Sequence, residues 1–291
     1  WIADLKAVEF QPHLEHQLKL PNLNTRLLMA THAALSHLSG RDEPSCGPML
    51  MAIALDPSRS AAVRAKSLQL VPVPGEDVSL DRLERLVEEG PPVVADEAMR
   101  ALWVHPDPDR ATVFARVAGN AAVPKNLRAD AVAGLAAFPG ERASFVESLL
   151  PDQEDTVAAE AARTLAVIRL RKRRVTPKPP PEDVAGWMAV VDSVNTPPDL
   201  ALGRRLFFHP VLGGCSRCHM LDGRGGRIGP DLTLINQQHD VTADWLMRHI
   251  VNPSAAIAPP YRTQLIVGTD GRVFTGLLRE GRDGRLQLLA A

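Results

Sequence analysis

Aromatic residues are scarce in this chain. Phenylalanine, tryptophan and tyrosine together make up 4% of its 291 residues, and there is a single tyrosine. Many of the apolar residues are alanine and leucine instead, and both favour the α-helix. The sequence therefore predicts a mostly α-helical fold in which helices pack closely against one another, rather than a large sheet.

A dominant charge and long apolar runs are also missing. The formal net charge is −1, which gives no global attraction to nucleic acid or to a membrane surface. No apolar run is long enough to cross a bilayer, and no signal peptide is visible. Because the chain begins at Trp1 without an initiator methionine, we expect it to be a processed or trimmed piece.

Cysteine is rare as well, with three residues, which is too few for a disulfide framework. Cys46 stands alone in the segment EPSCGPML, where we expect a free, semi-buried thiol. The other two, Cys215 and Cys218, are separated by two residues and followed directly by His219. This spacing makes the segment around them the main functional signal in the chain.

Four nine-residue segments repeat one apolar pattern. Their first, fifth, sixth and ninth positions are mostly apolar or small, which places these positions on one face of a helix. The third or fourth position is usually charged, and we expect it to face water. The segments begin at Val63, Val94, Leu127 and Val157, so that their starts are 31, 33 and 30 residues apart.

Partner helices are predicted between these segments. They begin near Ser79, Asp109 and Glu141, and Asn24 opens an earlier, degenerate unit. Helix pairs at a fixed period predict an α-solenoid of the HEAT-like or armadillo-like kind over roughly residues 60–170, with an irregular helical bundle as the alternative. We assign residues 1–170 to this HEAT-like helical repeat domain.

The composition changes after residue 170. Residues 171–183, RKRRVTPKPPPED, are first basic and then rich in proline, so they cannot continue a helix and should be extended and semi-rigid. The basic run is either a docking patch or, as is more common, a solvated boundary. We interpret residues 171–183 as a linker between two domains.

The Cys-x-x-Cys-His motif has the spacing of c-type haem attachment. The thiols of Cys215 and Cys218 would add across the haem vinyl groups, and His219 would become the proximal ligand of the iron. A zinc site would need a second pair of cysteine or histidine ligands, and none follows. A thioredoxin-like redox pair would follow a strand in a βαβ unit, which is not the setting here. The residues therefore predict one covalently bound haem c.

The flanks of the motif resemble class I cytochromes c. The segment LALGRRLFF matches a family helix that carries a glycine and, four residues later, an aromatic residue, here Gly203 and Phe207. The segment GPDL after the motif supplies Gly229 and Pro230. The resemblance implies that Pro230 presents its carbonyl to the second ring nitrogen of His219, which would fix the imidazole tautomer.

Glycines and arginines crowd the segment between these flanks. We expect Gly223, Gly225 and Gly226 to adopt positive φ and to let the backbone pass close to the porphyrin edge. Arg224 and Arg227 are candidates for contacts with the haem propionates, with plain surface arginines as the alternative.

A closer resemblance covers about residues 198–280. The motif, its Gly-rich turn, GPDLT, a helix ending in Asn-Pro-Ser, the segment IAPPY and a strand with an Asp-Gly turn are similar to the planctomycete-type haem-binding family. In that family the domain is often fused to HEAT-like repeats and, upstream, to a β-propeller, and no propeller is seen here. The resemblance implies a cytochrome c-like haem domain over residues 184–262.

Residues 263–291 depart from a plain cytochrome. They read as three short strands with turns at Asp270-Gly271 and Asp283-Gly284. We expect a small antiparallel β extension that packs against the haem domain.

The sixth ligand of the iron is left open by the sequence. Class I cytochromes place a methionine in a loop after the third helix, and the corresponding loop, NPSAAIAPPYRTQL, contains none. The candidates are Met247 and His249 on a helix predicted to begin at Thr242, His239 before that helix, Tyr261 in the loop, and Met220 beside His219. An open iron site is a further alternative. We favour His249, because its helix should lie on the distal side in a cytochrome c fold and imidazole binds both oxidation states of iron.

These features predict a c-type cytochrome that transfers electrons between redox proteins, such as a dehydrogenase and another cytochrome, with the repeat domain as a docking scaffold. We expect an electron-transfer protein or a subunit of a larger complex rather than a stand-alone enzyme. The alternatives are a haem-based peroxidase or small-ligand sensor with an open iron, and an interaction scaffold within a redox complex. Because haem is attached outside the cytoplasmic membrane, the resemblance implies a periplasmic or otherwise exported bacterial protein.

Overall fold

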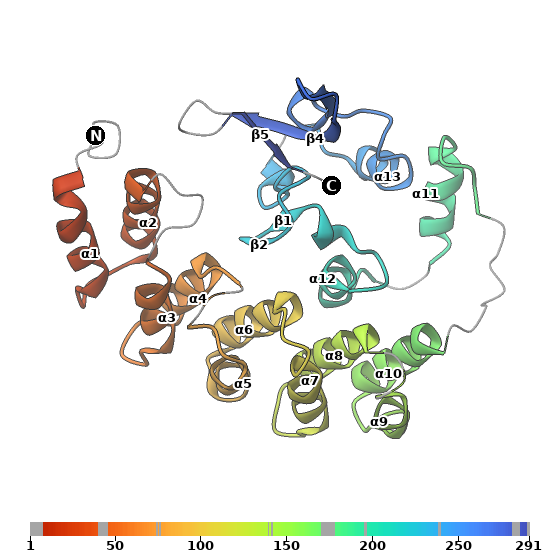
Figure 1. Ribbon diagram of the computed structural model, residues 1–291. Coiled ribbons are helices and arrows are strands. Elements are labelled where there is room, and N and C mark those ends of the chain that lie inside the picture. The colour runs from red at the N-terminus through yellow and green to blue at the C-terminus, as the bar shows by residue number, and fades with distance from the viewer. Residues whose placement is uncertain are drawn as a thin grey trace. The chain divides into compact units, whose positions relative to one another are not determined.

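The chain is mostly helical, as predicted, with a small antiparallel sheet towards its C-terminal end (Figure 1). The computed structural model describes residues 8–39, 46–73, 75, 77–138, 140, 142–169, 178–194, 197–237, 240–280 and 286–289. The chain divides into two compact units. The first unit is Trp1–Leu170 together with Phe208–Gly214, and the second is Arg171–Phe207 together with Cys215–Ala291. Over the described ranges, no helix combines the length and the apolar character needed to cross a membrane.

The first unit is a succession of helix pairs. Its helices are α1 (Gln11–Lys19), α2 (Thr25–Ser39), α3 (Gly47–Leu55), α4 (Ala61–Leu70), α5 (Leu80–Glu89), α6 (Pro92–Val104), α7 (Arg110–Gly119), α8 (Lys125–Gly134), α9 (Ala143–Ser148) and α10 (Asp155–Ile168). Each odd-numbered helix packs against the helix that follows it, and α4, α6, α8 and α10 pack against one another in turn (Figure 1). The four repeated sequence segments fall on these last four helices.

Local sequence explains where several of these helices begin. Ser60 caps α4, because its side-chain oxygen accepts a hydrogen bond from the Val63 amide at 3.3 Å. Ser79 caps α5 in the same way, with the Arg82 amide as donor. Pro92 opens α6, where its fixed φ suits the first turn and its missing N–H would have had no helical partner.

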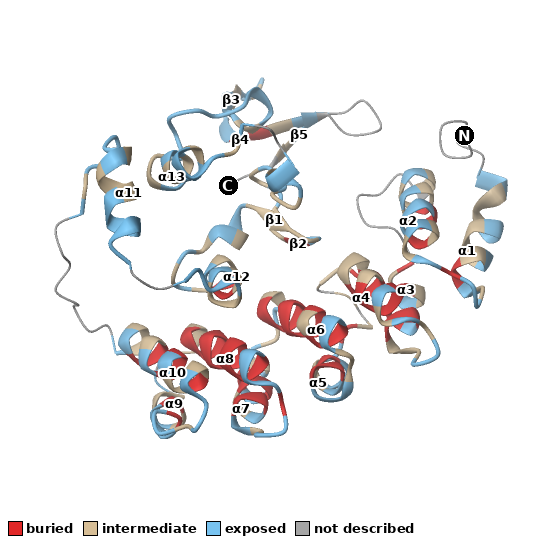
Figure 2. Cartoon of the chain, turned by 180° about the vertical axis from the view of Figure 1, so that it is seen from behind, coloured by how far each residue is buried: buried red, intermediate tan, exposed pale blue. Residues whose placement is uncertain are grey.

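The repeated apolar positions form the core of the first unit. Val63, Val94, Leu127 and Val157, which open the four segments, are all buried. Figure 2 shows buried residues running along α6 and α8 in particular. The hydrophobic periodicity therefore identified the correct helix face.

The prediction that the charged third or fourth position faces water is wrong. The fourth-position residues Glu97, Asp130 and Glu160 are only 3%, 7% and 2% exposed to solvent. Gln69 in α4 donates a hydrogen bond from Nε2 to Oε1 of Glu97 in α6 at 2.6 Å, so this position faces the neighbouring helix pair. Arg100 pairs with Glu97, and Arg163 pairs with Glu160, in each case one turn further along the same helix. Pairing of this kind makes a buried carboxylate tolerable.

Arginines near the start of α4 and α8 tie helices of a pair together. Arg64 donates from Nε to the Ala54 carbonyl in the last turn of α3, and Arg128 donates from Nε to the Ala118 carbonyl in the last turn of α7, both at 2.9 Å. Carbonyls in the last turn of a helix have no partner within it and carry the negative end of the helix dipole. The buried guanidinium of each arginine gives such a carbonyl a hydrogen-bond donor and places a positive charge at the negative end of the helix dipole.

Arg128 reaches the next helix pair as well. Its Nη1 and Nη2 donate to the two carboxylate oxygens of Asp152, in the turn between α9 and α10. Asp152 also accepts a hydrogen bond from the Glu154 amide at 2.9 Å. One side chain thus joins α8 to the end of α7 and to the start of α10.

In its described residues, the second unit combines three α-helices with two small sheets. Its elements are α11 (Val184–Asp192), α12 (Leu200–Phe208, whose last residue groups with the first unit), α13 (Ala243–Val251), β1 (Met220–Leu221), β2 (Arg224–Gly225), β3 (Thr263–Val267), β4 (Val273–Glu280) and β5 (Leu286–Leu289). α11 packs against α13. β3, β4 and β5 form an antiparallel sheet in chain order, which confirms the three predicted strands.

The turn at Asp270-Gly271 is confirmed. Gly271 has φ of 79°, and the Gly268 amide donates to the Arg272 carbonyl at 2.7 Å, which closes the hairpin between β3 and β4. The turn predicted at Asp283-Gly284 lies outside the described residues. The basic part of the predicted linker, residues 171–177, lies outside them too.

Apolar side chains of the second unit remain largely exposed. α11 and α13 contain no buried residue, whereas α6 alone contains nine. Ile250 on α13 is 72% exposed to solvent, and Val190 and Val191 on α11 are each 48% exposed. The described residues of this unit therefore leave much of its apolar surface uncovered, which is unusual for a compact unit.

Candidate functional site

The cysteine motif forms a single tight turn after α12. Gly213 and Gly214 lead into it with φ of 60° and 67°, and Cys215–Arg217 is a 3₁₀ helix. The amides of Cys218 and His219 both donate to the Cys215 carbonyl, at 3.2 and 2.9 Å. In a 3₁₀ turn the side chains of residues three apart lie on the same side, and both thiols are exposed. The turn therefore presents two accessible thiols from one side.

A two-residue hairpin follows the motif directly. β1 and β2 pair antiparallel, Met220 with Gly225 and Leu221 with Arg224. The connecting residues Asp222 and Gly223 have φ of 51° and 78°, and positive φ at both central residues is typical of a type I′ turn. This hairpin is not among the elements expected from the sequence. The Asp-Gly dipeptide was the signal that could have revealed it, because it is the preferred sequence for this turn.

The glycines after the hairpin fold the chain back onto the motif. The Gly226 amide donates to the Ser216 carbonyl, and the Gly229 amide donates to the Cys218 carbonyl, both at 2.7 Å. Positive φ is confirmed at Gly223 and at Gly225, where φ is 116°. It is absent at Gly226, where our expectation is wrong. Glycine is needed there because the backbone passes close to that of Arg217: a Cβ would lie 2.0 Å from the Arg217 carbonyl oxygen.

The returning chain fixes the ring of His219. Nδ1 of His219 lies 3.0 Å from the Pro230 carbonyl oxygen. A carbonyl only accepts hydrogen bonds, so in the neutral ring Nδ1 carries the proton and Nε2 keeps its lone pair. Gly229 lies against the ring, since a Cβ there would lie 2.7 Å from Cε1 and 2.8 Å from Nδ1. The structure thus brings together His219, Gly229 and Pro230 as a single unit with a defined tautomer.

The remaining residues expected near a haem are distributed around this turn. Phe207 on α12 is half-buried. Arg227 is exposed, and its backbone carbonyl accepts a hydrogen bond from Nη2 of Arg279 in β4 at 2.5 Å. The sheet is therefore attached to the Gly-rich turn. Arg224 keeps only 4% of its exposure, so the alternative that it is a plain surface arginine is wrong.

The candidates for a sixth ligand occupy three elements. Met247 and His249 are half-buried on α13, whose first turn is capped by the Thr242 hydroxyl as predicted. Tyr261 is half-buried at the end of the short 3₁₀ helix Pro259–Tyr261. Met220 lies in β1, and His239 lies outside the described residues.

The turn offers donor atoms that a covalently bound haem would use, two thiols and one imidazole. Across the described part of the chain, no three His, Cys, Asp or Glu side chains gather in a group able to hold a metal ion. Iron in a haem takes four ligands from the porphyrin and needs only axial ligands from the protein. Two exposed thiols and a histidine whose Nε2 lone pair is available are the protein groups that a covalently bound haem would need.

The third cysteine has a different environment. Cys46 begins α3 and keeps 2% of its exposure, so it is more buried than we expected. Burial raises the pKa of the Cys46 thiol to about 11. This thiol is therefore protonated at neutral pH and is a poor nucleophile.

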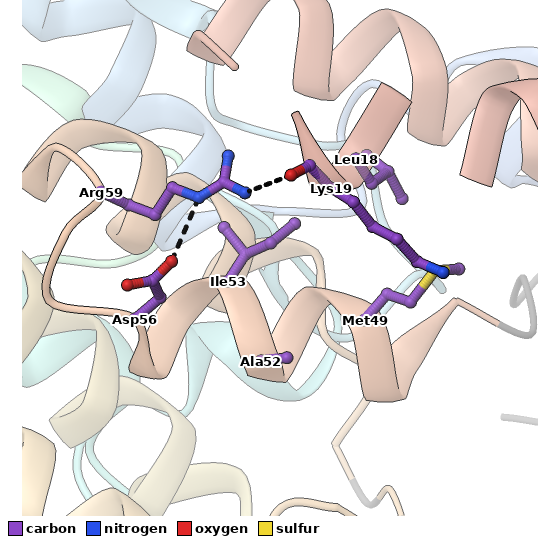
Figure 3. Close-up of a pocket in the computed structure, with 7 residues that line it drawn as sticks. All are labelled: Leu18, Lys19, Met49, Ala52, Ile53, Asp56 and Arg59. Atoms are coloured by element: carbon purple, nitrogen blue, oxygen red, sulfur yellow. Dashed lines mark hydrogen bonds and ion pairs between the residues drawn. The ribbon is translucent and has the colours of Figure 1, made fainter. Parts of the chain in front are cut away.

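A cavity of about 230 Å³ lies in the first unit between α1 and α3 (Figure 3). Its wall is mainly apolar, with Leu18, Met49 and Ile53 among the lining residues. Arg59 at its edge donates from Nη1 and Nη2 to the carbonyls at the end of α1 and from Nε to Asp56. Because these donors are already engaged, the guanidinium contributes to structure, and we assign the cavity no ligand.

Substitution of Gly229 should disturb the ring of His219. In a Gly229→Ala variant the new methyl group would overlap the imidazole, so the ring must move and its bond to Pro230 must lengthen. If the motif attaches haem as the sequence predicts, we expect its incorporation to fall by about tenfold or more, since groups that orient a metal ligand typically matter by that amount. The measurement is the ratio of Soret absorbance to protein. Gly203→Ala on α12, where a Cβ meets no atom within 4 Å, is the matched control and should incorporate haem normally.

The chain was also compared with known proteins. No protein-family model, no curated protein and no solved structure matches it.

Proposed function

We propose that this chain is a c-type cytochrome that carries one haem, covalently bound through Cys215 and Cys218 and ligated by His219. We further propose that it transfers electrons between redox proteins. The observation that carries the proposal is the contact of His219 Nδ1 with the Pro230 carbonyl at 3.0 Å, directly after a turn with two exposed thiols. A histidine that ligates a metal usually donates its other N–H to a carbonyl or carboxylate in this way.

The bound haem would supply reversible one-electron chemistry at its iron. The chain's own residues do the positioning. Cys215 and Cys218 would tether the haem, and the 3₁₀ turn holds the two cysteines close together in the chain. His219 would ligate the iron through Nε2, and the Pro230 carbonyl holds the proton on Nδ1. Backbone bonds from Gly226 and Gly229 keep this arrangement closed without bulky side chains.

The exposed apolar residues of the second unit support the same proposal. α11 and α13 carry apolar side chains but bury none of them. A porphyrin is a large, flat apolar group, and its burial against these side chains would supply the hydrophobic stabilisation that the described residues alone leave unrealised. The second unit would then be a cytochrome c-like domain of the planctomycete-type haem-binding family, with the haem as part of its core.

The first unit would act as the docking scaffold. Its helix pairs, stacked through α4, α6, α8 and α10, are consistent with a HEAT-like solenoid. Such repeats commonly present an extended surface to other proteins. A redox partner such as a dehydrogenase or another cytochrome would bind there, in a periplasmic or otherwise exported setting where haem attachment takes place.

The proposal is tested by producing the chain in a bacterial host that attaches haem c in its periplasm. Extraction with acidic acetone should leave the colour with the protein, and the pyridine haemochrome spectrum should be that of a haem with saturated vinyl positions. Cyclic voltammetry should give one reversible one-electron wave. Haem that leaves with the acetone, or zinc in place of iron, would overturn the attachment. A high-spin iron that turns over peroxide would overturn electron transfer.

A further inference from the structure

We propose that His249 is the second axial ligand of the iron and that Trp245 is its positioning residue. This inference rests on the proposed function, since it concerns the other face of the same haem. It goes beyond that function, because covalent attachment and electron transfer do not require any particular sixth ligand.

The ring of His249 is prepared in the same way as that of His219. Its Nδ1 lies 2.7 Å from the Trp245 carbonyl oxygen, against 3.0 Å between His219 Nδ1 and the Pro230 carbonyl. The carbonyl acts as acceptor, so Nδ1 carries the proton in the neutral ring and Nε2 keeps its lone pair. His219 and His249 are the two histidines of the second unit that the structure describes, and both have this tautomer.

The side chain of Trp245 adds a second constraint. Its ring stacks on that of His249 with a centroid distance of 3.8 Å and an interplanar angle of 27°. The hydrogen bond limits how far the imidazole can turn, and the stack fixes the plane in which it lies. A ligand whose ring is held in advance loses little conformational freedom on binding the metal.

The start of α13 is fixed as well. The Thr242 hydroxyl accepts a hydrogen bond from the Trp245 amide at 3.2 Å. The cap sets where the helix begins, and therefore the direction in which each of its side chains leaves the axis. Thr242, Trp245 and His249 thus form one connected series of contacts that ends at the imidazole.

Met247 is the rival ligand on the same helix. It lies two residues before His249, about 200° away around the axis, so the two side chains cannot both reach one iron. Met247 shares its side of the helix with two other apolar residues, Ala243 and Val251. His249 lies on the side of Trp245. The helix geometry therefore separates the apolar side that carries Met247 from the side on which the imidazole of His249 is already held in place.

The test begins with the wild-type holoprotein. Near-infrared magnetic circular dichroism and electron paramagnetic resonance of the ferric form distinguish bis-histidine from histidine–methionine coordination, and we expect the bis-histidine signature. A His249→Ala variant should become high-spin and should bind carbon monoxide when reduced. Added imidazole should restore the low-spin spectrum. Met247→Ala and Tyr261→Phe, as matched controls, should keep the wild-type spectrum.

Trp245 is tested by a rate rather than by the spectrum alone. In Trp245→Ala the Nδ1 bond to the backbone remains but the stack is lost, so external cyanide should displace the ligand about 10- to 100-fold faster. Trp245→Phe keeps an aromatic ring and should stay close to wild type. Equal rates in wild type and Trp245→Ala would remove the positioning role.

Failure of this inference is distinguishable from failure of the proposed function. Covalently bound haem with a histidine–methionine signature, or with an open high-spin iron, would overturn the ligand assignment while attachment stands. A His249→Ala variant that stays low-spin would overturn it too. Wild-type protein without covalent haem would instead overturn the proposed function.

Discussion

Replacement of both motif cysteines by alanine should abolish covalent haem attachment. In a Cys215→Ala/Cys218→Ala variant no thiol remains in the turn that precedes His219. The third thiol, Cys46, is buried in the first unit with its pKa raised to about 11, so it offers no substitute nucleophile. We expect the haem that survives acidic acetone extraction to fall from one per chain to none, measured by pyridine haemochrome absorbance against protein concentration.

The single variants and a matched control test each thiol separately. Cys46→Ala should retain the full complement of covalent haem. Cys215→Ala or Cys218→Ala alone leaves one thiol, so one vinyl group should survive and shift the haemochrome band to longer wavelength. Undiminished covalent haem in the double variant would show that the motif is not the attachment site.

Removal of Arg128 should have the largest effect on the stability of the first unit. An Arg128→Met change keeps most of the side-chain volume but leaves the Ala118 carbonyl and the Asp152 carboxylate without their partner. Breaking a buried ion pair from one side costs about 3–5 kcal/mol of folding free energy. We expect about 3 kcal/mol, the lower end of this range, because the side chain of Asp152 is still 12% exposed to solvent. Urea unfolding followed by far-ultraviolet circular dichroism measures the change.

Lys125 on the same helix provides the matched control. It pairs with Glu154 at 3.4 Å, but the two side chains keep 55% and 47% of their exposure. Lys125→Ala should therefore cost less than about 1 kcal/mol. Equal losses in Arg128→Met and Lys125→Ala would contradict the structural role given to Arg128.

The Arg128–Asp152 pair also predicts a dependence on pH. The hydrogen bond from Arg128 holds the pKa of Asp152 below its ordinary value. The stability that this carboxylate provides is therefore fully present above about pH 4, the ordinary value for aspartate, and is lost as the pH falls through the lowered pKa. In Arg128→Met the loss over this acid range should be smaller, because only the Glu154 amide still favours the charged form.

Local patterns predicted several elements well. The Thr242 cap was identified from its residue type and position. The helix at LALGRRLFF, which is α12 from its first residue to its last, was expected from the resemblance to class I cytochromes c. The Asp-Gly turn between β3 and β4 was also found. In each case the signal lies within a few consecutive residues, which is where periodicity and turn chemistry are informative.

Features that depend on distant or very short segments were not predictable. The charge at Glu97 indicated a solvated face, but periodicity cannot tell that a residue of the preceding helix pair, Gln69, lies against it. Nor could it reveal that Phe208–Gly214 groups with the first unit, where the Phe208 ring lies 5.7 Å from that of Trp103. Two-residue strands such as β1 and β2 are too short to show any alternation.

The stacking of neighbouring helix pairs in the first unit has a consequence for the order of events during synthesis. Each helix there packs mainly on helices close to it in the chain, so few long loops must close before contacts form, and such topologies fold quickly and step by step. We expect the repeats to fold while the rest of the chain is still being synthesised. The apolar side chains of α11 and α13, which the described residues leave uncovered, would be buried only later. The first half of the chain would then be structured before its second half is complete.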